Sequence, residues 1–105
     1  MAYRWPPKDP DEILDYSIDW SRFLATATIT TVTWYINNES NVKTLFSSGA
    51  TVNGIQNVAQ TNTNTVATIH LGLGTLNKEY LLYCSVQDSA RNTVERSVRL
   101  KIKEQ

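Results

Sequence analysis

The residues of this chain that could perform chemistry are few, and their spacing does not assemble them into a catalytic site. The sequence contains one histidine, His70, and one cysteine, Cys84. A cysteine nucleophile needs a base beside it. Cys84 falls on the apolar face of YLLYCSV, whereas His70 falls on the polar face of TVATIHLGL. Because their strands have opposite phases, we predict a buried thiol, a solvated histidine and no catalytic residue.

The residue types and their spacing also do not match a cofactor site or a metal site. The GLG at residues 72–74 lacks the further glycine and the helix that a phosphate-binding loop requires. Structural metal sites use several His and Cys ligands, so one of each predicts none. The acidic run DPDEILDYSID lacks the spacing and the glycine of an EF-hand, which leaves at most a weak calcium contact. We therefore predict a protein that is not an enzyme and has no cofactor and no metal.

Length and charge indicate one globular domain without a general affinity for polyanions. The chain has 105 residues, of which 41% are apolar. Ten Lys and Arg balance ten Asp and Glu, so the sequence predicts binding to neither nucleic acid nor membrane. Acidic residues gather in residues 8–19 and basic residues in residues 91–105. This distribution predicts pairing between the first and last strands, within one chain or between two copies.

The stretch LDYSIDWS, residues 14–21, alternates apolar and polar side chains and so predicts a strand with one buried face. A helical spacing through residues 13–23 competes with it, but four alternations favour the strand. Asp9-Pro10-Asp11-Glu12 predicts a short capped turn in front of this strand. Behind it, the spacing of Trp20, Phe23 and Leu24 predicts a helical turn at one end of the core.

The remaining sequence consists of short strands separated by turn signals. In ATITTVTWYI, Ile29 is out of phase with the later apolar residues, which predicts a bulge near Thr30 and Thr31. Asn53-Gly54 predicts a tight hairpin. QTNTNT at residues 60–65 is either a polar loop or an edge, and its composition favours the loop. The inward residues of the last three strands are Ala67, Ile69, Leu71 and Leu73, then Tyr80, Leu82, Cys84 and Val86, then Val94, Val98, Leu100 and Ile102. Seven or eight such strands predict an all-β, immunoglobulin-like antiparallel sandwich.

The first eight residues, MAYRWPPK, have no periodicity, and Pro6-Pro7 keeps their backbone extended. We predict an extended N-terminal arm at residues 1–8 and a sandwich domain at residues 9–105. The arm's aromatic side chains should dock on this domain or on a partner. Trp20 and Trp34 fall on inner strand faces, which leaves Trp5 free to anchor a partner. The predicted partner-binding residues are Tyr3, Arg4, Trp5, Pro6 and Pro7.

Two motifs resemble the fiber-tail adaptor proteins of tailed bacteriophages. One is KDPDEILDYSIDW at residues 8–20, which is followed by Phe23-Leu24 where the family has a W-L or F-L pair. The other is the closing hairpin YLLYCSVQDSARN at residues 80–92. This chain has Ala90 and Arg91 where the family has a glycine, so its hairpin must turn without one. Residues 37–66 look variable.

The resemblance implies a structural protein of the virion neck or tail that connects it to fibers or spikes. The implied partners are other virion proteins (a neck or tail adaptor or nozzle, and a fiber or spike) and copies of itself in a symmetric ring. Its implied location is the virion, after synthesis in the host cytoplasm. Two alternatives stay open. A capsid decoration or cement protein would share the fold and the lack of chemistry, and Tyr35 and Tyr83 would suit a carbohydrate-binding module.

Overall fold

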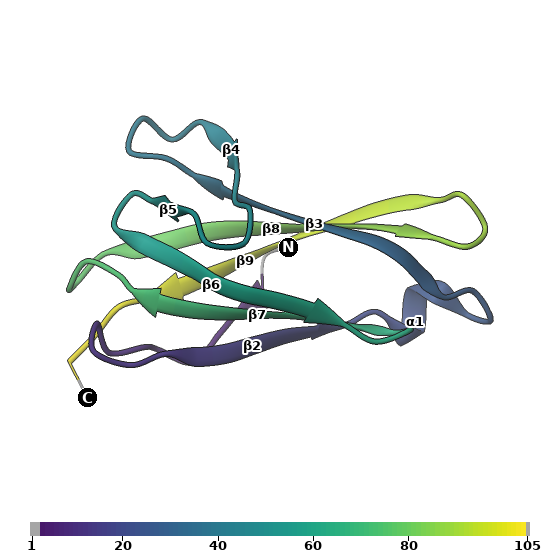
Figure 1. Ribbon diagram of the computed structural model, residues 1–105, viewed down its shortest axis with the longest axis horizontal. Helices are drawn as coiled ribbons and strands as arrows, with labels where there is room; N and C mark the ends of the chain where they lie inside the picture. Colours follow the sequence, from purple (N-terminus) through teal and green to yellow (C-terminus); the bar gives the residue numbers. More distant parts are fainter. Residues whose placement is uncertain (1–2, 105) are drawn as a thin grey trace.

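The computed structural model describes residues 3–104 as two β-sheets packed face to face (Figure 1). The first sheet has the order β1 (Tyr3–Arg4), β9 (Thr93–Lys101), β8 (Glu79–Asp88), β3 (Ile29–Asn37) and β4 (Lys43–Leu45). The second has the order β2 (Leu14–Asp19), β7 (Val66–Leu73), β6 (Ile55–Asn62) and β5 (Thr51–Val52). One short helix, α1 (Ser21–Leu24), follows β2. The predicted all-β sandwich is confirmed.

Side-chain alternation places the core between the sheets. Tyr16 and Ile18 of β2 are buried, while Asp15, Ser17 and Asp19 are exposed, as the period of two predicts. Trp20 and Trp34 are among the largest fully buried side chains, so their prediction as core residues is confirmed. Within residues 3–104, no helix has the length and apolar character needed to cross a membrane.

The local irregularities predicted for β3 and β5 are present. The pairing of β3 with β8 shifts register between Ile29 and Thr31, which returns Ile29 to the buried face. Asn53 and Gly54 both have positive φ and connect β5 to β6. Each irregularity depends on backbone geometry at one or two residues, which explains why the sequence predicted them.

Two predictions along the second sheet are wrong. Residues 60–62 were expected in a polar loop, but β6 continues to Asn62 because its backbone pairs with β7. Ladder hydrogen bonds in this pair outweigh the polar composition of the segment. Leu73 was expected in the core and is 52% exposed. Its φ of 59° ends the extended conformation of β7 and turns the side chain outward.

The hairpin between β8 and β9 turns without the family's glycine. Arg91 adopts the left-handed conformation with φ 68°. The carboxylate of Asp88 accepts hydrogen bonds from the backbone N–H groups of Ala90 (3.0 Å) and Asn92 (2.9 Å). The aspartate therefore stabilises a turn in which Arg91 takes a conformation that glycine adopts more readily.

Gly74 and Gly49 provide a matched test of packing at the end of the second sheet. Both have positive φ, 108° and 88°, but a Cβ on Gly74 would lie 2.8 Å from buried Ile102, whereas a Cβ on Gly49 would meet nothing within 4 Å. Gly49→Ala should cost about 1 kcal/mol of unfolding free energy through backbone strain alone. Gly74→Ala should cost about 2–4 kcal/mol, because overpacking adds to the strain. Urea unfolding measures both, and equal costs would contradict the close approach of Gly74 to Ile102.

Candidate interaction surface around the N-terminal arm

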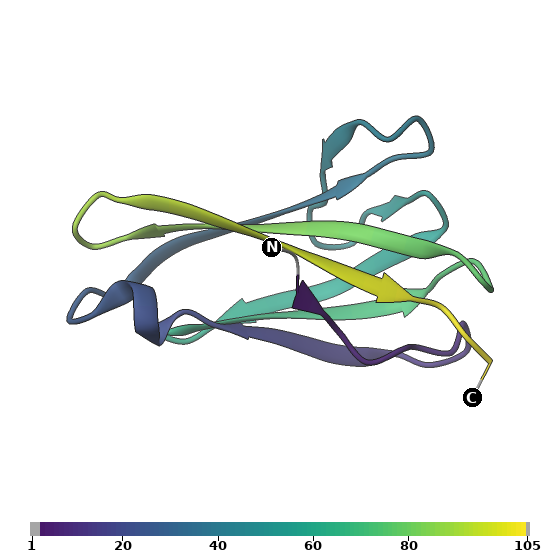
Figure 2. The same cartoon turned by 180° about the vertical axis from the view of Figure 1, so that it is seen from behind.

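The N-terminal arm lies on its own domain as the edge strand of the first sheet. β1 pairs in parallel with Val98 and Arg99 of β9. The Trp5 N–H continues this pairing by donating to the Arg99 carbonyl at 2.9 Å. Figure 2 shows the following residues crossing from β9 to the β2 side of the sandwich. The arm therefore joins the two sheets where both have an open edge.

Trp5 closes that open side. Its ring stacks on Tyr16 of β2, with centroids 4.7 Å apart and planes at 24°. The ring of Trp34 in β3 lies 6.0 Å away on the core side. Trp5 is 9% exposed, so the expectation that it stands free as an anchor is wrong for the single chain. Two aromatic faces of its own domain supply the apolar area that a partner was expected to supply.

The five residues predicted to bind a partner differ in their environment. Arg4, Pro6 and Pro7 are exposed, and Trp5 is buried. The backbone of Tyr3 lies in β1, and its side chain lies outside the described part of the structure. The arm therefore presents a guanidinium and two proline rings to an approaching molecule. Its role in partner binding stays a prediction.

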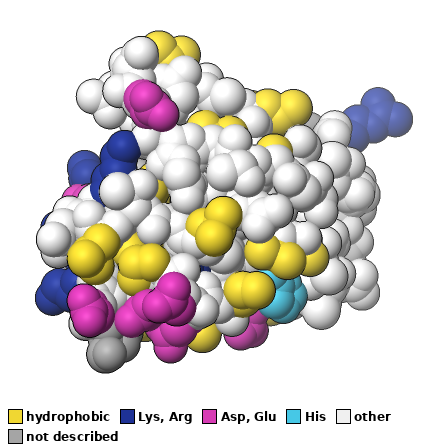
Figure 3. All heavy atoms as spheres, turned by 60° about the vertical axis from the view of Figure 1, so that its left-hand side comes forward, with side chains coloured by type: hydrophobic (Ala, Val, Ile, Leu, Met, Phe, Trp, Pro, Cys, Tyr) yellow, Lys and Arg dark blue, Asp and Glu magenta, His cyan; other side chains and the backbone are white. Residues whose placement is uncertain are grey.

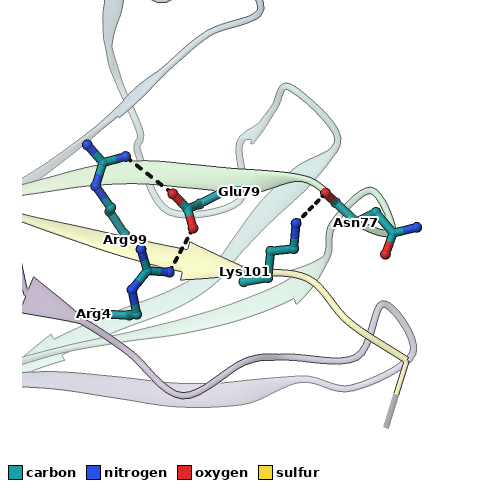
Figure 4. Close-up of polar contacts among 5 residues, drawn as sticks. All are labelled: Arg4, Asn77, Glu79, Arg99 and Lys101. Atoms are coloured by element: carbon teal, nitrogen blue, oxygen red, sulfur yellow. Dashed lines mark hydrogen bonds and ion pairs between the residues drawn. The ribbon is translucent and has the colours of Figure 1, made fainter.

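An ion pair attaches the arm to the sheet surface. Glu79 of β8 accepts from Arg4 at 2.7 Å and from Arg99 at 3.3 Å (Figure 4). The hydrogen bond from Arg4 holds the pKa of Glu79 below its usual value. Exposed pairs of this kind each contribute about 0.2–1 kcal/mol. The charge distribution led us to expect partners for Arg99 in residues 8–19, whereas the structure provides Glu79.

A shallow groove of about 250 Å³ runs between the arm and β2. Arg4 and Trp5 line one side, and Ser17, Ile18 and Asp19 line the other. The backbone N–H of Ser21 donates to Asp19, which lowers the pKa of this carboxyl. The groove thus has one wall with the Arg4 guanidinium and the Trp5 indole, and one wall with the Asp19 carboxylate.

Lys8 anchors the base of the arm, which the sequence analysis did not predict. Its side chain is fully buried, and its ammonium donates to the carbonyls of Leu73 (2.6 Å) and Asp9 (2.7 Å). Its backbone bonds to Lys101 and Lys103 beside the end of β9. Burial lowers the pKa of Lys8, although the neighbouring carboxylates oppose the change. A single base between Pro7 and an acidic turn was the available signal in the sequence.

The predicted short turn after Lys8 is confirmed. The N–H of Asp9 donates to the Glu12 carboxylate at 2.9 Å, and the N–H of Glu12 donates to the Asp9 carbonyl at 3.1 Å. The Asp9 carboxylate accepts from the N–H of Asp11 at 2.8 Å. These bonds form a reciprocal cap without a helix behind it. The KDPDE motif therefore builds a rigid corner from which β2 begins.

Exposed apolar side chains occur on the segments that meet at this corner. We call them the corner patch, and they are Ile13 (64% exposed), Val58 (37%), Leu73 (52%) and Leu76 (43%). Ile13 and Val58 meet above Gly72, whose missing side chain leaves room for both. Figure 3 shows apolar and acidic side chains next to each other on this face. A patch of apolar side chains rimmed by charge is typical of a protein contact.

His70 and Cys84 do not form a pair. Cys84 faces the core from β8 of the first sheet, whereas His70 belongs to β7 of the second sheet, opposite Asp15 of β2. Burial raises the pKa of Cys84 to about 12, so the predicted buried, unreactive thiol is confirmed. His70 is half-buried, with no partner for its buried Nδ1 among the described residues. The solvated histidine that the polar face of the strand predicted is therefore partly shielded from water.

Tyr35 and Tyr83 lie opposite each other on β3 and β8, and both are half-buried. The ammonium of Lys43 covers both rings, 4.6 Å and 5.0 Å from their centroids, and also pairs with Glu95. A sugar-binding platform presents an open aromatic face. Lys43 occupies that face here, which weakens the carbohydrate-binding alternative.

Lys8 provides a first test of the corner. Lys8→Ala should lower the unfolding free energy by about 2–4 kcal/mol, because it leaves a cavity and removes the donor to two carbonyls. Exposed Lys103 serves as the control, since Lys103→Ala should change stability by less than about 0.5 kcal/mol. Urea unfolding of both variants measures the difference. Equal stabilities would exclude a structural role for the buried ammonium.

Tyr16 provides a second test through pH. Burial raises its pKa from 10.0 to about 12. Between these values the unfolded chain has released the phenol proton and the native chain has kept it. The unfolding free energy should therefore fall as pH rises through this window. Tyr16→Phe should remove that part of the fall, as urea unfolding across the window would measure. Parallel pH profiles for the two proteins would contradict the buried phenol.

Comparison with known families places these features in context. The family model of the podophage GP4 fiber-tail adaptor protein gp77 matches residues 8–101. The match begins at Lys8 and includes every strand except β1. No curated protein matches the chain. The match confirms the resemblance found in KDPDEILDYSIDW and in the closing hairpin. Because it covers well over half of the sequence, the chain belongs to the family of podophage GP4 fiber-tail adaptor proteins.

Proposed function

We propose that this protein is a non-enzymatic structural component that connects the neck or tail of a phage virion to its fibers or spikes. The family match over residues 8–101 is the observation that carries the proposal. Membership of this family supports a structural adaptor role in the virion tail and contact with other tail proteins and fibers. The proposal adds the position at the junction with the fibers, synthesis in the host cytoplasm, and several copies in a symmetric ring.

An adaptor must hold at least two other molecules, and the chain offers two surfaces of different chemistry. The first is the arm with its groove, which presents Arg4 on one wall and Asp19 on the other. The second is the corner patch with the acidic residues beside it. The groove lies at the open edges of the two sheets, and the corner patch extends over the outer face of the second sheet. Two partners can therefore bind without competing for the same residues.

The corner patch is suited to a partner with an apolar centre and a basic rim. Ile13 and Leu76 leave much of their side-chain area in water, and a partner would gain free energy by covering it. Asp11, exposed in the KDPDE turn, adds negative charge beside Ile13. Opposite charge on the partner would speed the encounter and fix its orientation. We assign this surface to a neighbouring tail or fiber protein.

The rigidity of the chain supports a structural role. Lys8 bonds both to β7 and to the residues after β9, so the corner is attached to both sheets. Trp5 links the same sheets further along the open side. A part that transmits force between a tail and a fiber benefits from layers that cannot slide. The thiol and the imidazole on separate sheets are also in keeping with a protein without catalysis.

Substitutions in the corner patch test the proposal in virions. Phage that lack the gene for this protein would be complemented with chains carrying both Ile13→Lys and Leu76→Lys. We expect a folded protein, because both residues are exposed, and at least a tenfold loss of fibers per particle, because the substitutions place charge in an apolar contact. Quantitative mass spectrometry of purified virions measures the fibers.

Val42→Lys is the matched control, since Val42 is an exposed apolar residue (55%) between β3 and β4. It should leave the fiber content unchanged. The same spectra give the copy number of this chain, which should match tail symmetry, about a dozen or fewer. A copy number near that of the capsid protein, together with normal fibers on the double variant, would replace the adaptor role with that of a capsid cement protein.

A further inference from the structure

We propose that the neighbour covering the corner patch is a second copy of this chain, which binds there through the end of the sandwich that carries α1. The inference rests on the proposed function, because it names the partner of the corner patch and requires several adjacent copies. Its physical basis is a second exposed surface whose chemistry complements that of the corner patch. Both surfaces belong to the same chain and lie at opposite ends of it.

The second surface, which we call the α1 patch, consists of Arg22, Phe23 and Arg96. Phe23 of α1 is 49% exposed, and the guanidinium of Arg96 in β9 lies over its ring, 4.0 Å from the centroid. Arg22, next to Phe23 in α1, is exposed as well. The Phe23 ring also meets buried Trp20 in a T-shaped arrangement, with centroids 5.9 Å apart. The α1 patch is therefore an aromatic centre with cations on its rim.

Contacts within the chain hold the α1 patch in position. The backbone N–H groups of Phe23 and Leu24 both donate to the Trp20 carbonyl, at 2.9 Å and 3.1 Å. The side chain of Leu24 is buried in the core, which fixes the short helix to the sandwich. Side chains that are already ordered lose less conformational entropy when a partner binds. Aromatic and arginine side chains in such positions often carry much of the free energy of a protein contact.

The two patches have opposite charge. Residues 9–15 contain four carboxylates and no base. Asp11 and Asp15, on either side of Ile13, are exposed. The α1 patch carries two guanidiniums. Asp19 offsets part of that charge, and its carboxylate already accepts a backbone N–H of α1 at 2.9 Å. An apolar centre with an acidic rim thus matches an aromatic centre with a basic rim.

The two patches lie far apart along the long axis of the molecule. Figure 1 shows α1 toward the right-hand end and the beginning of β2 at the left-hand end. The described chain measures 40 Å along this axis and 27 Å across it. One chain therefore cannot join its own two patches, but each copy offers one of each kind. A contact between different surfaces is heterologous, and its repetition forms a ring when the rotation between copies closes.

Variants that disable one patch at a time test this contact in the purified protein. Ile13→Lys with Leu76→Lys disables the corner patch, and Arg22→Ala with Phe23→Ser disables the α1 patch. All four residues are exposed, so both variants should fold, with circular dichroism as the check. We expect the wild type to self-associate at millimolar concentration. Each variant alone should associate at least about tenfold more weakly, because each lacks one half of the contact.

A mixture of the two variants distinguishes a contact between unlike patches from other modes of association. The chain with the disabled α1 patch keeps its corner patch, and the chain with the disabled corner patch keeps its α1 patch. Each pair of unlike chains therefore has one intact contact. We expect one-to-one heterodimers that do not grow further, with a Kd within about threefold of the wild-type contact. Native mass spectrometry, with one chain isotope-labelled, counts the species across a concentration series.

Val42→Lys is the matched control, since Val42 is an exposed apolar residue (55%) that belongs to neither patch. It should associate as the wild type does. A wild type that stays monomeric at millimolar concentration, variants that associate as tightly as the wild type, or a mixture without heterodimers would each overturn the contact between copies. If Ile13→Lys with Leu76→Lys still removes fibers from virions in that case, the corner patch holds another tail protein and the adaptor role stands.

Discussion

The stacking of Trp5 on Tyr16 closes the open side of this sandwich, and the rest of the structure depends on this contact. The two sheets share a core, and on one side the first sheet ends in the two-residue strand β1 beside β9 and the second ends in β2. Trp5 is tied through its backbone to β9, stacks on β2 and approaches Trp34 of β3. One residue therefore connects three strands of two sheets. Without it, the aromatic faces of Tyr16 and Trp34 would be exposed to water, and the small core would lose the free energy of their burial.

The buried ammonium of Lys8 complements this contact at the base of the arm. A lysine without exposure is unfavourable unless its donors find acceptors, and here the carbonyls of Leu73 and Asp9 supply them. Such an arrangement adds little stability compared with an apolar residue, but it fixes geometry, because the acceptors must lie in set positions. The KDPDE turn then directs the chain into β2. The position of the arm thus follows from a polar anchor and an aromatic one.

We infer the function from the family and from the exposed surfaces, because Trp5 of the arm is buried in its own domain. An uncovered arm had been the physical reason to expect a joint between viral parts, and the burial of Trp5 removes that reason. The family match supports the structural adaptor role in its place. The corner patch, which sequence inspection did not identify, now stands as the surface with the strongest physical reason to be covered. Ile13 contributes most to it and directly precedes the strand β2.

The sequence by itself determined the features that depend on near neighbours along the chain. The alternation of apolar and polar residues determined which face of β2 is buried. Asn53-Gly54 determined a hairpin, and the change in apolar phase after Ile29 determined a bulge. These follow from backbone geometry over two to four residues, where side-chain type and spacing suffice. The two sequence motifs were also enough to identify the family.

The tertiary structure alone decided where Trp5 and Lys8 lie, why β6 runs on to Asn62, and why Leu73 faces water. The positions of Trp5 and Lys8 depend on segments distant in sequence. The end of β6 depends on pairing with the next strand, β7, and the outward side chain of Leu73 depends on its own positive φ. Trp5 needs the gap that β9 and β2 leave open, Lys8 needs the carbonyl of Leu73, and Asn62 needs β7 beside it. Because the N-terminal segment has no periodicity, its sequence does not predict the surface on which it packs. That surface exists only once the sheets have packed.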